Sequence, residues 1–233
     1  MNFTTLLKDL CHVVYPKVCP GCAKYPQSET NLFCNTCQQE LTFSHTGLVP
    51  TENRMISLFD NQYPIINAIA LYAMDTDSLM DHCIKELKYN HRPEIGVGLG
   101  ELFANRFQHF LKTEKIEYLI PVPLHRRKFI HRGYNQSLEI CKGISSKTNI
   151  PISINTLSRT KQTKTQTGKS KSLRLQSLKL AFNILSENEV KGKHVLLIDD
   201  VITTGATLQG CISVLKRIEN IRISIACIAL PVE

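Results

Sequence analysis

The chain has 233 residues, of which 42% are hydrophobic and 21% are charged, and its formal net charge is +8. This composition excludes an intrinsically disordered chain, and the length allows a sizeable buried core without disulfides. No segment approaches the roughly 18 apolar residues of a membrane span, and the first residues lack the basic segment of a signal peptide, which predicts a cytoplasmic protein with no membrane insertion.

The N-terminal segment is predicted to be a small metal-binding module. An amphipathic helix is expected over residues 3–14, because the apolar residues fall on one helical stripe, and Pro16 ends it. The stretches CPGC and CNTC follow, and each has the Cys-x2-Cys spacing that lets two thiolates converge on one ion. We predict a structural zinc (Zn2+) ribbon over residues 1–46 with four tetrahedral ligands: Cys19, Cys22, Cys34 and Cys37. The spacing leaves iron open as the alternative metal.

The remaining five cysteines are predicted to be small core residues, because they lie in predicted helices or strands: Cys11, Cys83, Cys141, Cys211 and Cys227. In a reducing compartment none of the cysteines is expected to form a disulfide. Residues 46–62 are polar and poorly patterned. We predict that they link the cysteine module to a second domain over residues 63–233.

The second domain shows short apolar segments that alternate with longer helical patterns. Strands are expected where the segments are rich in β-branched residues: 65–73, 117–122, 195–200 and 222–230. Helices are expected at 77–90, 95–112, 134–148 and 205–218. The runs YLIPV and VLLI lack polar alternation, as expected for strands that are covered on both faces. The fold class is therefore predicted to be α/β with a parallel sheet.

Positive charge is concentrated between two of the predicted strands. The stretch PVPLHRRKFIHRGYNQ, residues 121–136, leaves a strand and carries a cluster of arginine, lysine and histidine side chains. No Asp or Glu occurs between Ile140 and Ser186, and residues 160–174 have the composition of a mobile basic loop. This asymmetry favours an anionic partner, either a phosphate ligand or nucleic acid, over a solvated basic face.

The stretch HVLLIDDVITTGATLQG, residues 194–210, ends an apolar strand with two adjacent carboxylates. Ligands of α/β proteins bind at the carboxyl ends of parallel strands, so Asp199 and Asp200 are expected at such a site. The small residues that follow let backbone N–H groups surround a phosphate, and the next helix adds its positive end. Carboxylates beside such a loop accept hydrogen bonds from sugar hydroxyls, directly or through magnesium (Mg2+). The residues thus predict a site for a ribose with a 5′-phosphate.

The stretch VLLIDDVITTGATL resembles the phosphoribosyl-pyrophosphate (PRPP) signature of type I phosphoribosyltransferases. This resemblance implies that Asp199 and Asp200 are catalytic residues that contact the ribose hydroxyls. It also implies a PRPP-binding loop with these members: Val201, Thr203, Thr204, Gly205, Ala206 and Thr207. PRPP carries a second anion, a pyrophosphate, on C1. We expect Lys128 and Arg132 to hold it, because cationic side chains and above all the arginine fork suit pyrophosphate oxygens.

The order of the motifs along the chain narrows the resemblance to one group within the type I phosphoribosyltransferases. The cysteine module, IKELKY at 84–89, RGYNQ at 132–136 and Gln-Thr-Gly at 166–168 precede the signature, and this order is similar to that of the ComF family (ComFC-like competence proteins). The resemblance covers nearly the whole chain and implies a type I phosphoribosyltransferase-like domain behind an N-terminal zinc ribbon, with a part in DNA uptake during natural transformation. Two activities stay open. One is an Mg2+-dependent transferase that releases pyrophosphate, and the other is a non-catalytic factor that senses PRPP or handles single-stranded DNA.

Overall fold

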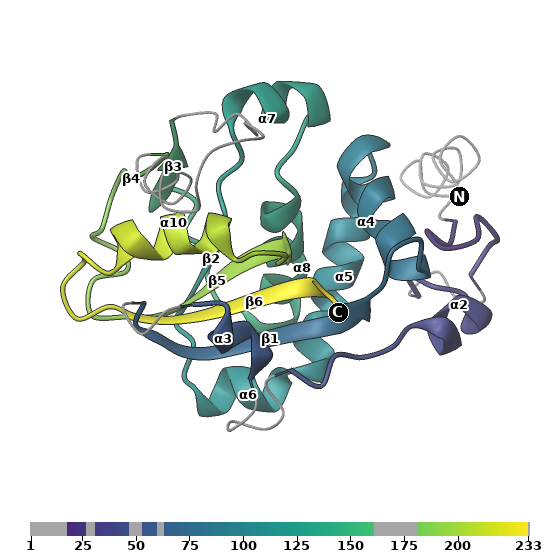
Figure 1. Ribbon diagram of the computed structural model, residues 1–233, viewed down its shortest axis with the longest axis horizontal. Coiled ribbons are helices and arrows are strands. Elements are labelled where there is room, and N and C mark those ends of the chain that lie inside the picture. Colours follow the sequence, from purple (N-terminus) through teal and green to yellow (C-terminus); the bar gives the residue numbers. More distant parts are fainter. Residues whose placement is uncertain (1–17, 27–30, 47–52, 60–62, 161–180, 233) are drawn as a thin grey trace, which may run out of the picture.

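The computed structural model describes residues 18–26, 31–46, 53–59, 63–160 and 181–232 (Figure 1). Three sequence predictions lie outside these residues, namely the helix over 3–14, the burial of Cys11 and most of the basic stretch 160–174. In the part of the chain that the structure describes, no helix has the length and apolar character that a membrane span needs.

A parallel sheet with the strand order β1-β6-β5-β2 forms the centre of the protein. Its strands agree with the four sequence predictions: β1 (Ile65–Met74), β2 (Tyr118–Pro121), β5 (His194–Val201) and β6 (Arg222–Pro231). Neighbouring residues of β5 enter different cores, because Leu196 and Ile198 pack on one face and Val195 and Leu197 on the other. The apolar runs without alternation are therefore strands that are covered on both faces, as predicted.

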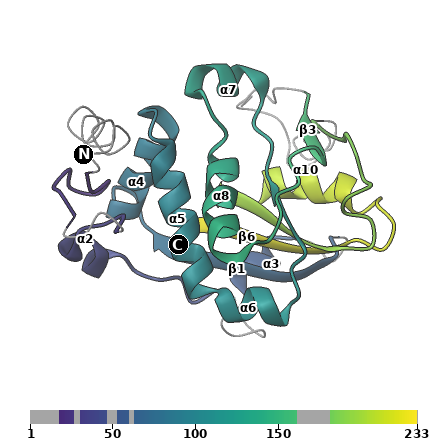
Figure 2. The ribbon, with the colours of Figure 1, turned by 180° about the vertical axis from the view of Figure 1, so that it is seen from behind.

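Helices form a layer on each side of the sheet (Figures 1 and 2). One face packs against α4 (Leu79–Tyr89), α5 (Pro93–Arg106), α6 (Gln108–Thr113) and α8 (Gln136–Thr148). The other face packs against α10 (Ala206–Leu215) and α3 (Arg54–Ser57). A parallel sheet between two helical layers confirms the predicted α/β class.

The position of α8 is fixed by its contact with α5. The two helix backbones approach closely, because a Cβ at Gly143 would collide with the carbonyl oxygen of Val97, and one at Gly100 with that of Ile140. A larger residue at either glycine would push the helices apart. Since Asn135, just before α8, donates its Nδ2 hydrogen to the carbonyl oxygen of Val122, this contact also places the start of α8 beside the end of β2.

The predicted linker over residues 46–62 is partly structured. Asn53 caps the short helix α3, because its side-chain oxygen accepts hydrogen bonds from the N–H groups of Met55 and Ile56. Met55 is fully buried and Phe59 is 7% exposed, and both pack in the core beneath α10. Isolated apolar residues in a polar stretch have no periodicity, which is why the sequence pattern did not predict this anchor.

The predicted basic loop contains a helix, α7 (Arg126–Arg132). The Nδ1 atom of His125 accepts a hydrogen bond from the N–H of Arg127 at 3.2 Å, and Gly133 ends the helix with a φ of 80°. None of the residues of α7 is buried, so the helix has no apolar stripe by which its sequence could predict it.

Two further differences concern short elements. The predicted helix over 95–112 is divided at Phe107 into α5 and α6. A short antiparallel pair, β3 (Leu157–Arg159) and β4 (Phe182–Ile184), was not predicted and flanks the end of β2 through the segment around Ile152. Strands of this length carry too few residues for a recognisable alternation.

The cysteine module packs directly against the sheet. Its helix α2 (Asn35–Glu40) begins within the second cysteine pair, and Cys19, Cys34 and Cys37 belong to the same buried core as α4 and α5. Phe43 pairs with Tyr72 of β1 as an antiparallel bridge, with ring centroids 5.1 Å apart. The division of the chain at residues 46 and 63 remains a prediction, and the shared core couples its two parts.

Candidate functional site

The strands β5 and β2 lie side by side, and the chain leaves them toward opposite faces of the sheet. After β2 it continues to α8 in one core, and after β5 to α10 in the other. In α/β proteins the carboxyl ends of two such strands form the usual ligand site. At these ends the structure brings together the acid pair of β5 and the first residues of α8.

The two acids are adjacent in β5, and each has a different side-chain partner from the helical layer that contains α4 and α8. Asp200 is 8% exposed, and its Oδ1 atom lies 3.2 Å from the Nζ atom of Lys88 on α4. The Oδ1 atom of Asp199 accepts hydrogen bonds from the Ser137 hydroxyl at 3.2 Å and from the N–H of Asp200 at 2.9 Å. Both predicted acids are thus at the carboxyl edge, each held by a residue from the helical layer.

The surroundings of Asp199 are unfavourable for its charged state. Burial, and then the neighbouring charge of Asp200, raise the pKa of Asp199 to about 7, although Lys88 and Ser137 act in the opposite direction. An acid that is perturbed to this extent by burial and a like charge is typical of a functional site.

The loop after β5 turns sharply into α10. Gly205 precedes the helix with a φ of 70°, and a Cβ at this position would also meet the ring of Phe59 at 3.2 Å. Among the described residues no side chain caps α10, so the N–H groups of its first turn are available to a ligand. All the predicted loop residues line one small hollow together with Asp199, Ile202 and Leu208: Val201, Thr203, Thr204, Gly205, Ala206 and Thr207.

The basic residues predicted for the second anion lie on one face of α7. Lys128 and Arg132 are one helical turn apart, and the Cζ atom of Arg132 lies 5.3 Å from the ring centroid of Tyr89. Partial desolvation of this exposed side chain, and then the charges of Arg132, Arg159 and Lys88, lower the pKa of Lys128, whereas the charge of Asp200 raises it. The predicted cations therefore lie in the electrostatic neighbourhood of the acid pair.

Three residues of this site were not predicted. Lys88 lies in the IKELKY stretch and Ser137 directly follows RGYNQ, but no local pattern indicates that they contact the acids. Arg159 is the last residue of β3, and its Cζ atom lies 5.1 Å from the ring centroid of Phe182. Their contacts join segments that are far apart in the sequence, so only the fold shows them.

The four predicted metal ligands form a cluster in the cysteine module. The Sγ atoms of Cys19, Cys22, Cys34 and Cys37 all lie within 4.8 Å of one another, with 3.5 Å between those of Cys22 and Cys34. Four sulfurs at the tetrahedral Zn–S distance of about 2.3 Å are roughly 3.8 Å apart, so the cluster fits a metal such as zinc. A backbone hydrogen bond from Cys37 lowers the pKa of Cys34 to about 7, which favours a thiolate ligand.

The packing of the cluster and the other cysteines agrees with the prediction. A Cβ at Gly21 would lie 2.9 Å from the Sγ atom of Cys37, so the first pair needs glycine at this turn. The described cysteines outside the cluster are unpaired and buried, as predicted: Cys83, Cys141, Cys211 and Cys227.

Comparison with known proteins agrees with this architecture. Residues 135–231 match the family described as "Phosphoribosyl transferase domain". "Competence protein F" of Haemophilus influenzae is 32% identical over 214 residues, which are 89% of this chain and 87% of that protein.

Two further relatives cover most of the chain. "DNA utilization protein YhgH" of Escherichia coli O157:H7 is 29% identical over 91% of this chain and 83% of that protein. "Competence protein ComFC" of Bacillus subtilis is 26% identical over 82% of this chain and 68% of that protein. On its fold, its cysteine cluster and these similarities, the chain belongs to the competence protein F (ComF) family, with a type I phosphoribosyltransferase domain.

Proposed function

We propose that this protein binds PRPP together with Mg2+ at the carboxyl edge of the sheet and transfers the phosphoribosyl group to an acceptor, with release of pyrophosphate. The observation that carries the proposal is a pair of adjacent carboxylates, one buried and one partly buried, followed by an uncapped helix start; a short loop with a left-handed glycine joins the two. Carboxylates suit hydroxyl donors and free N–H groups suit a phosphate, so the pair of features matches the two ends of a ribose 5-phosphate.

The donor set also fits the proposed metal. Mg2+ prefers oxygen ligands, keeps several waters and is commonly held by one or two carboxylates together with substrate phosphates. Asp199 and Asp200 offer such carboxylates, either to the ion or to the ribose hydroxyls beside it. Bound Mg2+ would supply charge neutralisation to the pyrophosphate.

The transfer also requires groups that stabilise the departing pyrophosphate, and residues of this chain can supply them. The bond from C1 to pyrophosphate breaks, a bond from C1 to the acceptor forms, and negative charge develops on the departing pyrophosphate. Lys128 and Arg132 on α7 are the cations proposed to stabilise this charge, because fixed cations near a developing anion lower the barrier. The structure offers several cations but no described residue that identifies the acceptor.

A second candidate function is the binding of single-stranded DNA along α7, either beside the transfer or in place of it. The helix presents Phe129 and Ile130 at 48% and 71% exposure, next to Arg126 and Arg127. Aromatic rings beside arginines are the usual surface for stacked bases and their phosphates. The relatives carry names that refer to competence and DNA utilization, which supports a DNA-related role for this chain as well.

Replacement of both acids by their amides should abolish PRPP binding. Hydrogen bonds to charged groups contribute about 1.5–3 kcal/mol each, so Asp199→Asn plus Asp200→Asn should weaken the affinity at least about 100-fold. Isothermal titration calorimetry with PRPP and Mg2+ measures the change. Glu219→Gln, which removes an exposed partner of Lys191, is the control and should leave the affinity unchanged. Equal affinities of the wild type and the double variant would refute the assignment of the acids.

The single change Asp199→Asn should stabilise the ligand-free protein at alkaline pH. In the folded state the pKa of Asp199 is raised to about 7, so the folded protein holds a proton that the unfolded chain releases near pH 4. The acid therefore stabilises folding at low pH and loses that contribution as the pH rises through about 7. We expect the variant to melt several degrees above the wild type at pH 8 and at nearly the same temperature at pH 4.5. Calorimetric melting at the two pH values tests this, and a gap that does not change with pH would contradict it.

Removal of one cysteine ligand should release the metal. We expect about one zinc ion per chain in the wild type, by mass spectrometry of the metals, and almost none in Cys34→Ser, because a tetrahedral site that loses a thiolate binds far more weakly. The variant should also melt at a lower temperature, because its cluster belongs to the buried core. Cys141→Ala, in a buried cysteine outside the cluster, is the control that keeps the metal. Iron in place of zinc, or a metal-free wild type, would overturn the zinc assignment.

The DNA function makes a separate prediction about the outer side of α7. Arg126→Ala plus Arg127→Ala should weaken the binding of a fluorescent oligothymidine, and the slope of log affinity against log salt should fall by about 1.4, since each arginine neutralises one phosphate of a single strand. Phe129→Ala should weaken binding through lost stacking. PRPP affinity should stay unchanged in both variants. Oligothymidine binding that is indifferent to all three changes would exclude α7 as the DNA surface.

A further inference from the structure

The side chain of Gln136 has a donor that no described group satisfies. Gln136 is the first residue of α8 and is 2% exposed. Its Nε2 atom is buried and has no hydrogen-bond acceptor among the described residues. Buried polar groups almost always have partners, and an exception calls for a physical explanation.

The orientation of this amide is determined by its neighbour. The Nη1 atom of Arg132 lies 2.8 Å from the Oε1 atom of Gln136. Because a guanidinium can only donate hydrogen bonds, the atom beside it must be the carbonyl oxygen, and the other atom must be the NH2 group. Gln136 therefore presents two donors, and reversing its amide would place donor against donor at Arg132.

The residues on either side of Gln136 tie it to the proposed site. The Ser137 hydroxyl donates to Asp199 at 3.2 Å, and the Asn135 side chain caps the helix by accepting from the N–H of Ser137 at 3.1 Å. The Tyr134 hydroxyl donates to the carbonyl oxygen of Leu87, next to Lys88. The amide thus lies on the path from the basic helix α7 to the acid pair.

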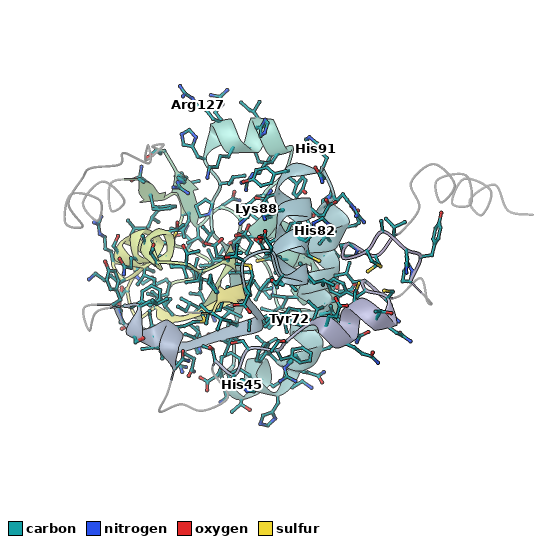
Figure 3. The ribbon with its side chains drawn as sticks, turned by 45° about the vertical axis from the view of Figure 1, so that its right-hand side comes forward. His45, Tyr72, His82, Lys88, His91 and Arg127 are labelled. Carbon is teal, nitrogen blue, oxygen red and sulfur yellow. The ribbon has the colours of Figure 1, made fainter. Side chains whose placement is uncertain are left out.

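Figure 3 shows that the side chains of Lys88 and Arg127 point to different sides of α7. Lys88 lies inside the molecule beneath α7, where it pairs with Asp200, whereas Arg127 points outward from the far side of α7. Arg132, which contacts Gln136 at the start of α8, therefore lies toward the proposed site, whereas Arg127 belongs to the outer side that was considered for DNA.

The groups around the amide of Gln136 determine which kind of acceptor could hydrogen-bond to its NH2 group. A free NH2 group requires an acceptor, and the adjacent guanidinium of Arg132 favours one that is negatively charged. The acids Asp199 and Asp200 are already engaged with Ser137 and Lys88. An oxygen of an anionic ligand fits this position, and the ligand that the proposed function requires carries two anions, of which the 5′-phosphate belongs to the start of α10.

We propose that Gln136 is a specificity-determining residue, whose amide donates to an oxygen of the anionic group on C1 of the ligand beside Arg132, so that the protein selects PRPP over ribose 5-phosphate. The inference rests on the proposed function, because it assumes that the acid pair and α10 hold the sugar phosphate. That no described residue accepts from this amide is then a consequence of selection for the bound state, in which the ligand supplies the acceptor.

Two variants separate this role from a structural one. Gln136→Glu keeps an acceptor for Arg132 and replaces the donor by a carboxylate, which repels an anion. Gln136→Met keeps the length of the side chain and removes the unsatisfied donor. Gln209→Glu is the matched control, because the Nε2 atom of Gln209 is satisfied by the carbonyl oxygen of Leu58 at 3.0 Å.

Isothermal titration calorimetry with PRPP, inorganic pyrophosphate and ribose 5-phosphate, each with Mg2+, provides the test. In Gln136→Glu the affinities for PRPP and pyrophosphate should fall at least about 10-fold, and that for ribose 5-phosphate should change by less than about 2-fold. Gln136→Met should show the same selective loss and melt no lower than the wild type, whereas Gln209→Glu should melt lower and keep its selectivity.

The outcomes are distinguishable from a failure of the proposed function. A wild type that binds neither PRPP nor ribose 5-phosphate refutes the proposed function, whereas pyrophosphate binding that Gln136→Glu abolishes still supports the anion subsite. Equal losses for PRPP and ribose 5-phosphate in Gln136→Glu would overturn the inference. Unchanged affinities, or a lower melting temperature in Gln136→Met without a change in selectivity, would overturn it as well.

Discussion

The placing of two adjacent carboxylates, one buried and one partly buried, at the end of β5 is the constraint on which the arrangement of the site depends. Neither acid could remain there without support, since like charges repel and burial penalises the ionised form. The support comes from one helical layer, as Lys88 of α4 pairs with Asp200 and the Ser137 hydroxyl of α8 donates to Asp199. The strand order brings these helices to the same edge of the sheet, so the sheet topology determines which side chains support the acids.

A short run at the start of α8 connects the parts of the site. Consecutive side chains from Tyr134 to Ser137 contact α4, the end of β2, the basic helix α7 and the acid pair, in that order. The glycine contact between α5 and α8 fixes the helix that carries them. A displacement of α8 would therefore disturb the cations of α7 and the acids of β5 together. Helix α8 thus connects the two proposed anion sites.

The sequence predicts what depends on local chemistry and misses what depends on distant contacts. The strands, the acid pair, the loop of small residues around Gly205 and the cysteine cluster all follow from residue type and spacing. The helix α7 was predicted as a loop, because an exposed basic helix has no apolar periodicity. Met55 was placed in a linker although it is fully buried, since a single apolar anchor has no pattern. The Lys88 contact joins β5 to another helix, and only the fold reveals it.

The central claim is that the acid pair and the start of α10 together hold a ribose 5-phosphate. A crystal structure of the protein with Mg2+ and PRPP would measure this directly. We expect the ribose hydroxyls to contact Asp199 and Asp200 by hydrogen bonds or through Mg2+. We expect the 5′-phosphate to accept hydrogen bonds from the N–H groups between Thr203 and Thr207. A ligand bound elsewhere, with the pair of Lys88 and Asp200 unchanged and the start of α10 free, would contradict it.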